Sequence, residues 1–140
     1  LTEIPFAFLD PESGARITQL KFTRENPTTL MIRSVTADGI RIGDEVYERT
    51  IGLTLETIID DWQQRSIADL VEDDFAALLD ANPEVIVLGT GATNIFPPRE
   101  LVFAMARRQV GFEFMDTAAA ARTYNVLAGE GRRVAALLCL

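Results

Sequence analysis

The stretch that decides the fold reads Glu84-Val85-Ile86-Val87-Leu88-Gly89-Thr90-Gly91-Ala92-Thr93-Asn94. Its apolar part carries no charge, as is typical of a central strand buried on both faces. The glycines after it predict a tight loop, and Pro97 and Pro98 then predict the start of a helix, because proline is tolerated in a first helical turn. This order of strand, polar loop and helix indicates an α/β fold, which places binding sites at the carboxyl ends of its strands.

A second polar signature, Met115-Asp116-Thr117, follows at the end of the next predicted strand, over residues 110–115. Asp116 is well suited to cap a helix that we expect over residues 117–128, and Gly129 or Gly131 can end that helix. The run of alanines at 118–121 allows this helix to approach a sheet closely. A last apolar strand is expected over residues 134–140.

The first half of the chain has the short alternating pattern of antiparallel strands. Turn signals at Ala37-Asp38-Gly39 and Gly43-Asp44 predict a β-meander over residues 30–51. A further strand is expected over 54–61, and apolar spacing predicts helices over 69–81 and 99–108. Residues 1–27 contain prolines and no sustained period, which predicts an irregular arm before a single domain at 28–140. The whole pattern predicts an α/β fold with a mixed, helix-covered sheet and an N-terminal β-meander.

The composition excludes several classes of function. A net charge of −8 argues against a nucleic-acid partner, because phosphate binding needs a basic surface. The arginines of the last third could still form a local basic flank for an acidic partner, or simply lie on solvated helix faces. No apolar run is long enough to cross a bilayer, and Leu1 does not open a secretory pattern. A cytoplasmic location is therefore expected.

The chain has no histidine and a single cysteine, Cys139. This removes the Ser-His and Cys-His nucleophile systems, any internal disulfide and the usual ligands of zinc or iron. Only hard cations would suit the remaining carboxylates and carbonyls. We expect no metal and no cofactor, lean against an enzyme, and expect Cys139 to be inert core in its apolar strand.

The loop Gly89-Thr90-Gly91 has two interpretations. It could expose backbone N–H groups to an anion, as phosphate loops do. The dinucleotide-binding pattern nevertheless fails, because Asn94 stands at its third glycine position and the following prolines remove helix N–H donors. We favour a tight turn in which Gly91 holds a positive φ.

The helix start has the same ambiguity. Asp116 and Thr117 could contact a ligand or cap the helix, and Arg122 and Asn125 could bind a carboxylate or phosphate from the same helix face. We favour a structural role in which a buried Arg122 pairs with Asp116 or Glu130. The candidate ligand-binding residues are thus Gly89, Thr90, Gly91, Asp116, Thr117, Arg122 and Asn125.

These residues also carry a resemblance to a known family. The motifs are Leu88-Gly89-Thr90-Gly91, Pro97, Met115-Asp116-Thr117, Ala120, Arg122-Thr123-Tyr124-Asn125, Glu130-Gly131-Arg132 and Val134-Ala135-Ala136-Leu137. They resemble the family of mitochondrial complex I assembly factor 3 and its bacterial and archaeal relatives, many of which are known only as a domain of unknown function. The resemblance covers residues 30–140.

The resemblance implies a three-layer fold with a central mixed five-stranded sheet, one edge of which is formed by the early hairpins. It also implies a non-enzymatic role in assembling the respiratory NADH:ubiquinone reductase, with no catalytic residue to transfer. Our first hypothesis is therefore a small binding or assembly protein with a protein partner. The alternative is a protein, or an enzyme, that binds a small anionic ligand at the loop 89–91 and the helix start 116–125.

Overall fold

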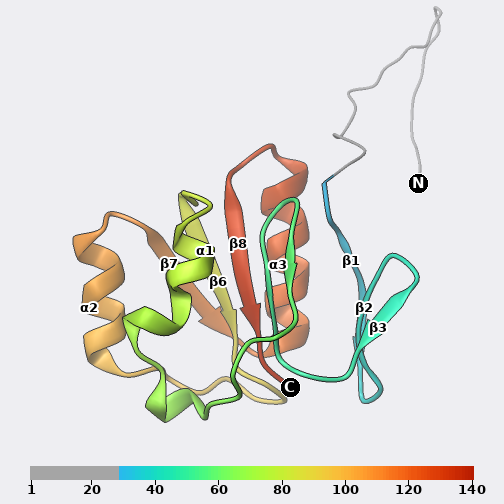
Figure 1. Cartoon of the computed structure of the whole chain (residues 1–140), viewed down its shortest axis with the longest axis horizontal. Coiled ribbons are helices and arrows are strands. Elements are labelled where there is room, and N and C mark those ends of the chain that lie inside the picture. The colour runs from blue at the N-terminus through green and yellow to red at the C-terminus, as the bar shows by residue number, and fades with distance from the viewer. Residues whose placement is uncertain (1–28) are drawn as a thin grey trace, which may run out of the picture.

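The computed structural model describes residues 29–140, so the arm predicted for residues 1–27 lies outside the described part of the chain. Eight strands, two 3₁₀ helices and three α-helices follow one another along it (Figure 1). In chain order they are β1 (Ile32–Thr36), β2 (Gly39–Ile42), β3 (Glu45–Tyr47), β4 (Ile51–Leu53), β5 (Ile58–Ile59), η1 (Ile67–Asp69), η2 (Glu72–Phe75), α1 (Ala76–Leu79), β6 (Val85–Gly89), α2 (Arg99–Arg107), β7 (Gly111–Met115), α3 (Thr117–Gly129) and β8 (Val134–Leu138).

The central sheet has five strands in the order β5-β4-β8-β6-β7. Strands β6, β7 and β8 are parallel, whereas β4 is antiparallel to β8 and β5 is antiparallel to β4. The sheet is therefore mixed, as expected, and the β4–β5 hairpin forms one of its edges. The earlier strands β1, β2 and β3 form the predicted meander as a separate three-stranded antiparallel sheet, so the expectation that the early hairpins form an edge of the central sheet is wrong.

Two apolar cores, one on each face of the sheet, give the fold three layers. Val85 and Val87 of β6 point into a core that includes Tyr124 of α3, and the same core takes up the apolar face of the three-stranded sheet. The alternate residues Ile86 and Leu88 point into a second core with α2 and the segment from η1 to α1. Because β6 is buried along its whole length on both faces, it reads as an uninterrupted apolar run.

The strand expected over residues 54–61 is wrong. The chain turns instead, and only Ile58–Ile59 returns to pair with β4. The hydroxyl of Thr54 accepts hydrogen bonds from the backbone N–H groups of Glu56 and Thr57, at 3.3 and 3.0 Å. Such local side-chain bonds compete with a strand ladder and close a turn. The alternation of apolar residues here spans a hairpin rather than one strand.

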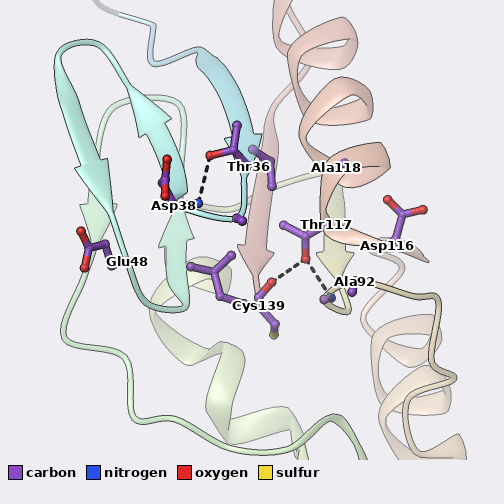
Figure 2. A pocket seen from close by; sticks show the side chains of 12 residues that line it. Thr36, Asp38, Glu48, Ala92, Asp116, Thr117, Ala118 and Cys139 are labelled. Atoms are coloured by element: carbon purple, nitrogen blue, oxygen red, sulfur yellow. Dashed lines mark hydrogen bonds between the residues drawn. The ribbon is translucent and has the colours of Figure 1, made fainter.

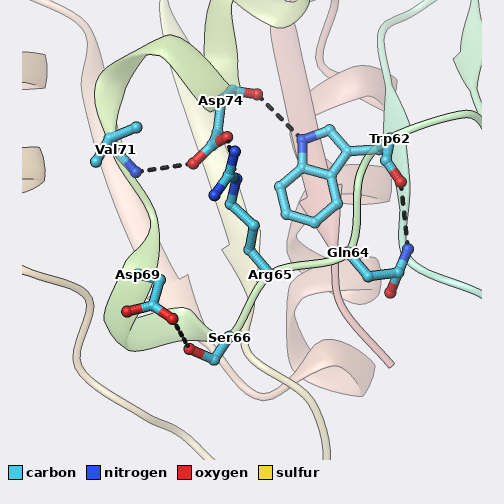
Figure 3. A network of polar contacts seen from close by, with 7 residues as sticks. All are labelled: Trp62, Gln64, Arg65, Ser66, Asp69, Val71 and Asp74. Carbon is cyan, nitrogen blue, oxygen red and sulfur yellow. Dashed lines mark hydrogen bonds and ion pairs between the residues drawn. The ribbon is translucent and has the colours of Figure 1, made fainter.

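The helix expected over residues 69–81 is also wrong in extent, because the segment consists of η1, η2 and the short α1. Asp74 lies at the centre of a polar network that fixes this shape (Figure 3). Its carboxylate accepts from the Arg65 side chain at 2.8 Å and from the Val71 backbone N–H at 2.9 Å, and its backbone carbonyl accepts from the Trp62 indole at 3.1 Å. These bonds break the segment into short turns. The predicted stop is correct, since Asn82 has a φ of +55°.

The helices expected over 99–108 and 117–128 are confirmed as α2 and α3. The inward face of α3 carries Ala120, Ala121, Tyr124 and Ala128, all buried. None of the helices in residues 29–140 combines the length and the apolar character that crossing a bilayer requires.

Candidate functional site

The carboxyl ends of β6, β7 and β8 meet the N-terminus of α3 at one side of an open cleft with a volume of about 760 Å³. The opposite wall is the turn between β1 and β2, with Asp38 at its tip, together with Glu48 (Figure 2). Gly91, Asp116 and Thr117 line the cleft, so the structure brings these predicted residues together. The cleft lies between the two sheets, at the strand ends where α/β folds place ligands.

Thr117 joins three segments of the chain below the floor of the cleft. Its hydroxyl accepts from the Gly91 backbone N–H at 2.8 Å and donates to the Cys139 backbone carbonyl at 2.5 Å. The Thr117 backbone N–H in turn donates to the Gly91 carbonyl at 2.9 Å. The residue is 2% exposed, and its hydroxyl already forms hydrogen bonds within the protein, so it is not available to bind a ligand.

Thr90 has a similar structural role on the other side of the loop. Its hydroxyl lies 2.6 Å from the Thr93 carbonyl and 3.2 Å from the Met115 carbonyl, and it accepts from the Ile95 N–H at 3.1 Å. A hydroxyl has one hydrogen to donate, so the two carbonyls share it. These contacts hold the loop against the end of β7 and leave Thr90 buried.

The two glycines of the loop have different reasons to be glycine. A Cβ on Gly89 would lie 2.8 Å from the Thr117 hydroxyl oxygen and 2.9 Å from its Cα, so α3 packs directly on this backbone. Gly91 has a φ of +104°, which confirms the expected turn, and a Cβ there would meet nothing within 4 Å. Gly89 is thus required by packing and Gly91 by backbone conformation.

Asp116 is the N-cap of α3, as expected. Its carboxylate accepts from the Ala119 backbone N–H at 2.9 Å. The charged residues that line the cleft among residues 29–140 are Asp38, Glu48 and Asp116, and all of them are acidic. A carboxylate at the helix N-terminus already occupies the position that an anion would seek. The electrostatics of this wall therefore disfavour an anionic ligand.

Asn125 lies away from the cleft and ties α3 to β1. Its amide donates to the Ile32 carbonyl at 2.7 Å and its oxygen accepts from the Ile32 N–H at 2.9 Å. The adjacent Tyr124 hydroxyl lies 3.0 Å from the Leu30 carbonyl and 3.1 Å from the Thr54 carbonyl, and burial raises the pKa of this phenol. Both side chains therefore attach the three-stranded sheet and the hairpin to the main body.

The buried ion pair expected for Arg122 is wrong. Arg122 is exposed on α3, and among residues 29–140 it forms no salt bridge with Asp116, Glu130 or any other acid. The side chain of Arg122 is exposed on the outer surface of α3 and does not line the cleft. Arg122 and Asn125 therefore do not join the cleft residues.

Sequence reasoning missed the contribution of the C-terminal strand to this site. Cys139 lines the cleft, and burial raises the pKa of its thiol to about 11. Thr50 is buried beside it and accepts from the Leu140 N–H at 3.2 Å. Thr50, a polar residue directly before β4, was the one hint of this contact in the sequence, but its partner Leu140 lies at the far end of the chain. The expectation that Cys139 is buried is confirmed, whereas its inertness stays a prediction.

Comparison with known proteins gives the chain a family. The model of a family described as a protein of unknown function (DUF498/DUF598) matches residues 32–139. The chain belongs to this family. The resemblance noted from the sequence motifs is thereby confirmed, since a bovine protein named NADH dehydrogenase (ubiquinone) 1 alpha subcomplex assembly factor 3 is 27% identical over 150 aligned residues, covering 98% of this chain and 79% of the bovine protein.

Two further proteins that resemble this DUF498/DUF598 member are bacterial. A protein of Francisella tularensis subsp. holarctica named 13 kDa major membrane protein is 35% identical over 95 residues, which cover 66% of this chain and 72% of that protein. A crystal structure of a Bordetella parapertussis protein superimposes with a TM-score of 0.74 at 31% identity, covering 80% of this chain and 96% of the other. This chain therefore shares its fold with the Bordetella protein.

Proposed function

We propose that this protein is a small non-enzymatic binding protein that acts as an assembly factor by holding a protein partner. The main observation behind the proposal is that the polar residues of the sequence motifs form hydrogen bonds within the protein itself. The hydroxyls of Thr90 and Thr117 and the amide of Asn125 all bond to backbone groups of distant segments. Side chains engaged in this way rigidify a scaffold and are not free to perform acid–base or nucleophilic chemistry.

The bovine relative supports a more specific version, in which the partner belongs to the respiratory NADH dehydrogenase. We place the protein in the cytoplasm. Because the Francisella relative is named a membrane protein, the test also asks whether this protein is found in the membrane fraction. Fractionation of native cells distinguishes the two locations: protein in the cleared cytosol supports our placement, whereas protein that sediments with membranes contradicts it.

The experiment for this function is cross-linked capture of the tagged full chain from its native cells, with quantitation of the assembled NADH dehydrogenase on native gels in a deletion strain. We expect a reproducible protein partner and a reduced level of the assembled complex. A matched variant, Gly91→Ala, alters the cleft without altering the outer surface and is expected to retain the partner. Absence of any reproducible partner together with normal assembly would overturn the proposal.

A second candidate function is binding of a small molecule in the cleft. Its volume, about 760 Å³, is within the range of ligand sites, and no side chain fills the space above Gly91. Thermal melts with a panel of phosphates, nucleotides and amines test this idea. The carboxylates of the cleft predict that cationic compounds raise the melting temperature more than anionic ones do, and a panel without effect would remove this candidate.

A further inference from the structure

Strand β7 is a free edge of the central sheet (Figure 1). The opposite edge strand, β5, has only two residues, which leaves little backbone to pair. In contrast β7 has five residues and no partner strand on its outer side among residues 29–140. Exposed edges of this length present unpaired N–H and C=O groups, which natural proteins either protect or use.

The register of β7 identifies which backbone groups face outward. Gly111 donates to the Glu84 carbonyl at 2.9 Å, and the Met115 carbonyl accepts from Thr90 at 2.8 Å, so the odd-numbered residues bond toward β6. Alternation in a parallel ladder then directs the N–H and C=O groups of Phe112 and Phe114 to the outside. No residue within 29–140 bonds to them.

An apolar surface lies beside these groups on the α2 side of the sheet. The side chains of Phe112 and Phe114 are partly buried against the core beneath α2. Phe96 packs edge-on against Phe114, with ring centroids 5.2 Å apart, and is 78% exposed. A large aromatic ring held in place yet left this exposed is typical of a protein-binding surface.

The other face of the same edge carries a charge. Glu113 is exposed, points to the α3 side, and forms no ion pair with any described residue. If a second copy paired antiparallel so that Phe112 faced Phe114, Glu113 would lie directly opposite its own counterpart. Like charges in this position are unfavourable, so the edge is protected against self-association. A basic residue opposite Glu113 would be favourable.

We propose that the β7 edge, defined as residues 112–114 together with Phe96, binds an extended segment of the protein partner as a sixth strand of the sheet. This inference rests on the proposed partner-binding function and names the surface and the chemistry of the partner. Directly opposed residues share a face, so the segment presents an apolar side chain beside Phe112, a lysine or arginine beside Glu113, and an apolar side chain beside Phe114. Backbone bonds supply affinity and the alternate side chains supply specificity.

The test uses two short extended peptides that differ only in the central residue, one with lysine between valines and one with glutamate. Backbone amide NMR of the full chain at millimolar peptide is the measurement. The lysine peptide is expected to shift and protect the amides of Phe112 and Phe114 and to bind about fivefold more tightly than the glutamate peptide. Glu113→Lys reverses this preference, and the matched control Glu56→Lys, an exposed position at the opposite sheet edge, leaves it unchanged.

Three results would overturn the inference. They are unchanged amides of Phe112 and Phe114 with both peptides, equal binding of the two peptides, and a wild-type dimer that already protects these amides. The capture experiment separates this inference from the proposed function. If Glu113→Lys keeps a partner that wild type also captures, the surface is wrong and the function stands. If the peptides bind as predicted but wild type captures no partner, the function is wrong and the surface stands.

Discussion

Replacing Thr117 with valine tests whether the Met115-Asp116-Thr117 signature is a structural joint. Valine keeps the shape of threonine but removes the hydroxyl, so the Gly91 N–H and the Cys139 carbonyl lose their partner. An unsatisfied buried polar group costs about 1–3 kcal/mol. Gly91 borders the cleft, where water can replace part of its bond, so we expect a loss of about 2–3 kcal/mol in the free energy of unfolding.

Urea and thermal unfolding of wild type, Thr117→Val and Thr117→Ser measure this loss. At roughly 3–4 °C per kcal/mol for a domain of this size, the valine variant should melt about 8 °C below wild type. Serine keeps the hydroxyl and loses one methyl group, which costs about 1 kcal/mol. Equal melting temperatures for the valine variant and wild type, or a serine variant less stable than the valine variant, would refute the reasoning.

The remaining predictions concern the other candidate residues. Asn125→Leu removes both bonds to Ile32 and should cost about 1–3 kcal/mol while accelerating hydrogen exchange of the Ile32 amide; unchanged exchange would contradict the role of this joint. Gly91→Ala should cost about 1 kcal/mol in a thermal melt because φ is +104°, and no loss would remove the strain argument. Arg122→Ala should change stability by no more than about 0.5 kcal/mol, since the residue is exposed, and a larger loss would restore the ion pair that we reject. Burial raises the pKa of Cys139 from 9.0 to about 11, so the folded state keeps the thiol proton longer than the unfolded state does. The stability that this supplies is complete below pH 9 and is lost as the pH rises toward 11; in pH-dependent melts, Cys139→Ala should flatten the decline over this range, and an unchanged slope would contradict the shift.

Much of the fold could be predicted because the deciding signals are local. The charge-free runs that became β6 and β8 match strands buried on both faces, and the Asp116 cap acts on an N–H only one turn away. The segment that was wrongly predicted as one helix over residues 69–81 depends on contacts with residues outside the segment. Asp74 breaks the expected helix through Trp62 and Arg65, whose positions relative to it are set by the fold and not by a repeating pattern.

The site was predictable only in part. Glycines after an apolar strand indicate a turn at the strand end, so the tight turn at Gly89-Thr90-Gly91 could be predicted from the sequence. The hydrogen bond from the Thr117 hydroxyl to the Cys139 carbonyl could not be predicted, because the pairing of β8 in the sheet is what brings Cys139 close to Thr117. The exposure of Arg122 depends on which flank of α3 the three-stranded sheet covers, and helical spacing alone does not reveal that.

Amide hydrogen exchange of the protein, alone and in complex with its captured partner, tests both proposals at once. We infer that Thr90, Thr117 and Asn125 hold the scaffold together and that the partner binds the β7 edge. Phe112 and Phe114 should therefore gain protection in the complex, while the amides around the cleft, including Ala118, keep their exchange rates. Protection confined to the cleft, with β7 unchanged, would show that the partner binds at the cleft and not at the β7 edge.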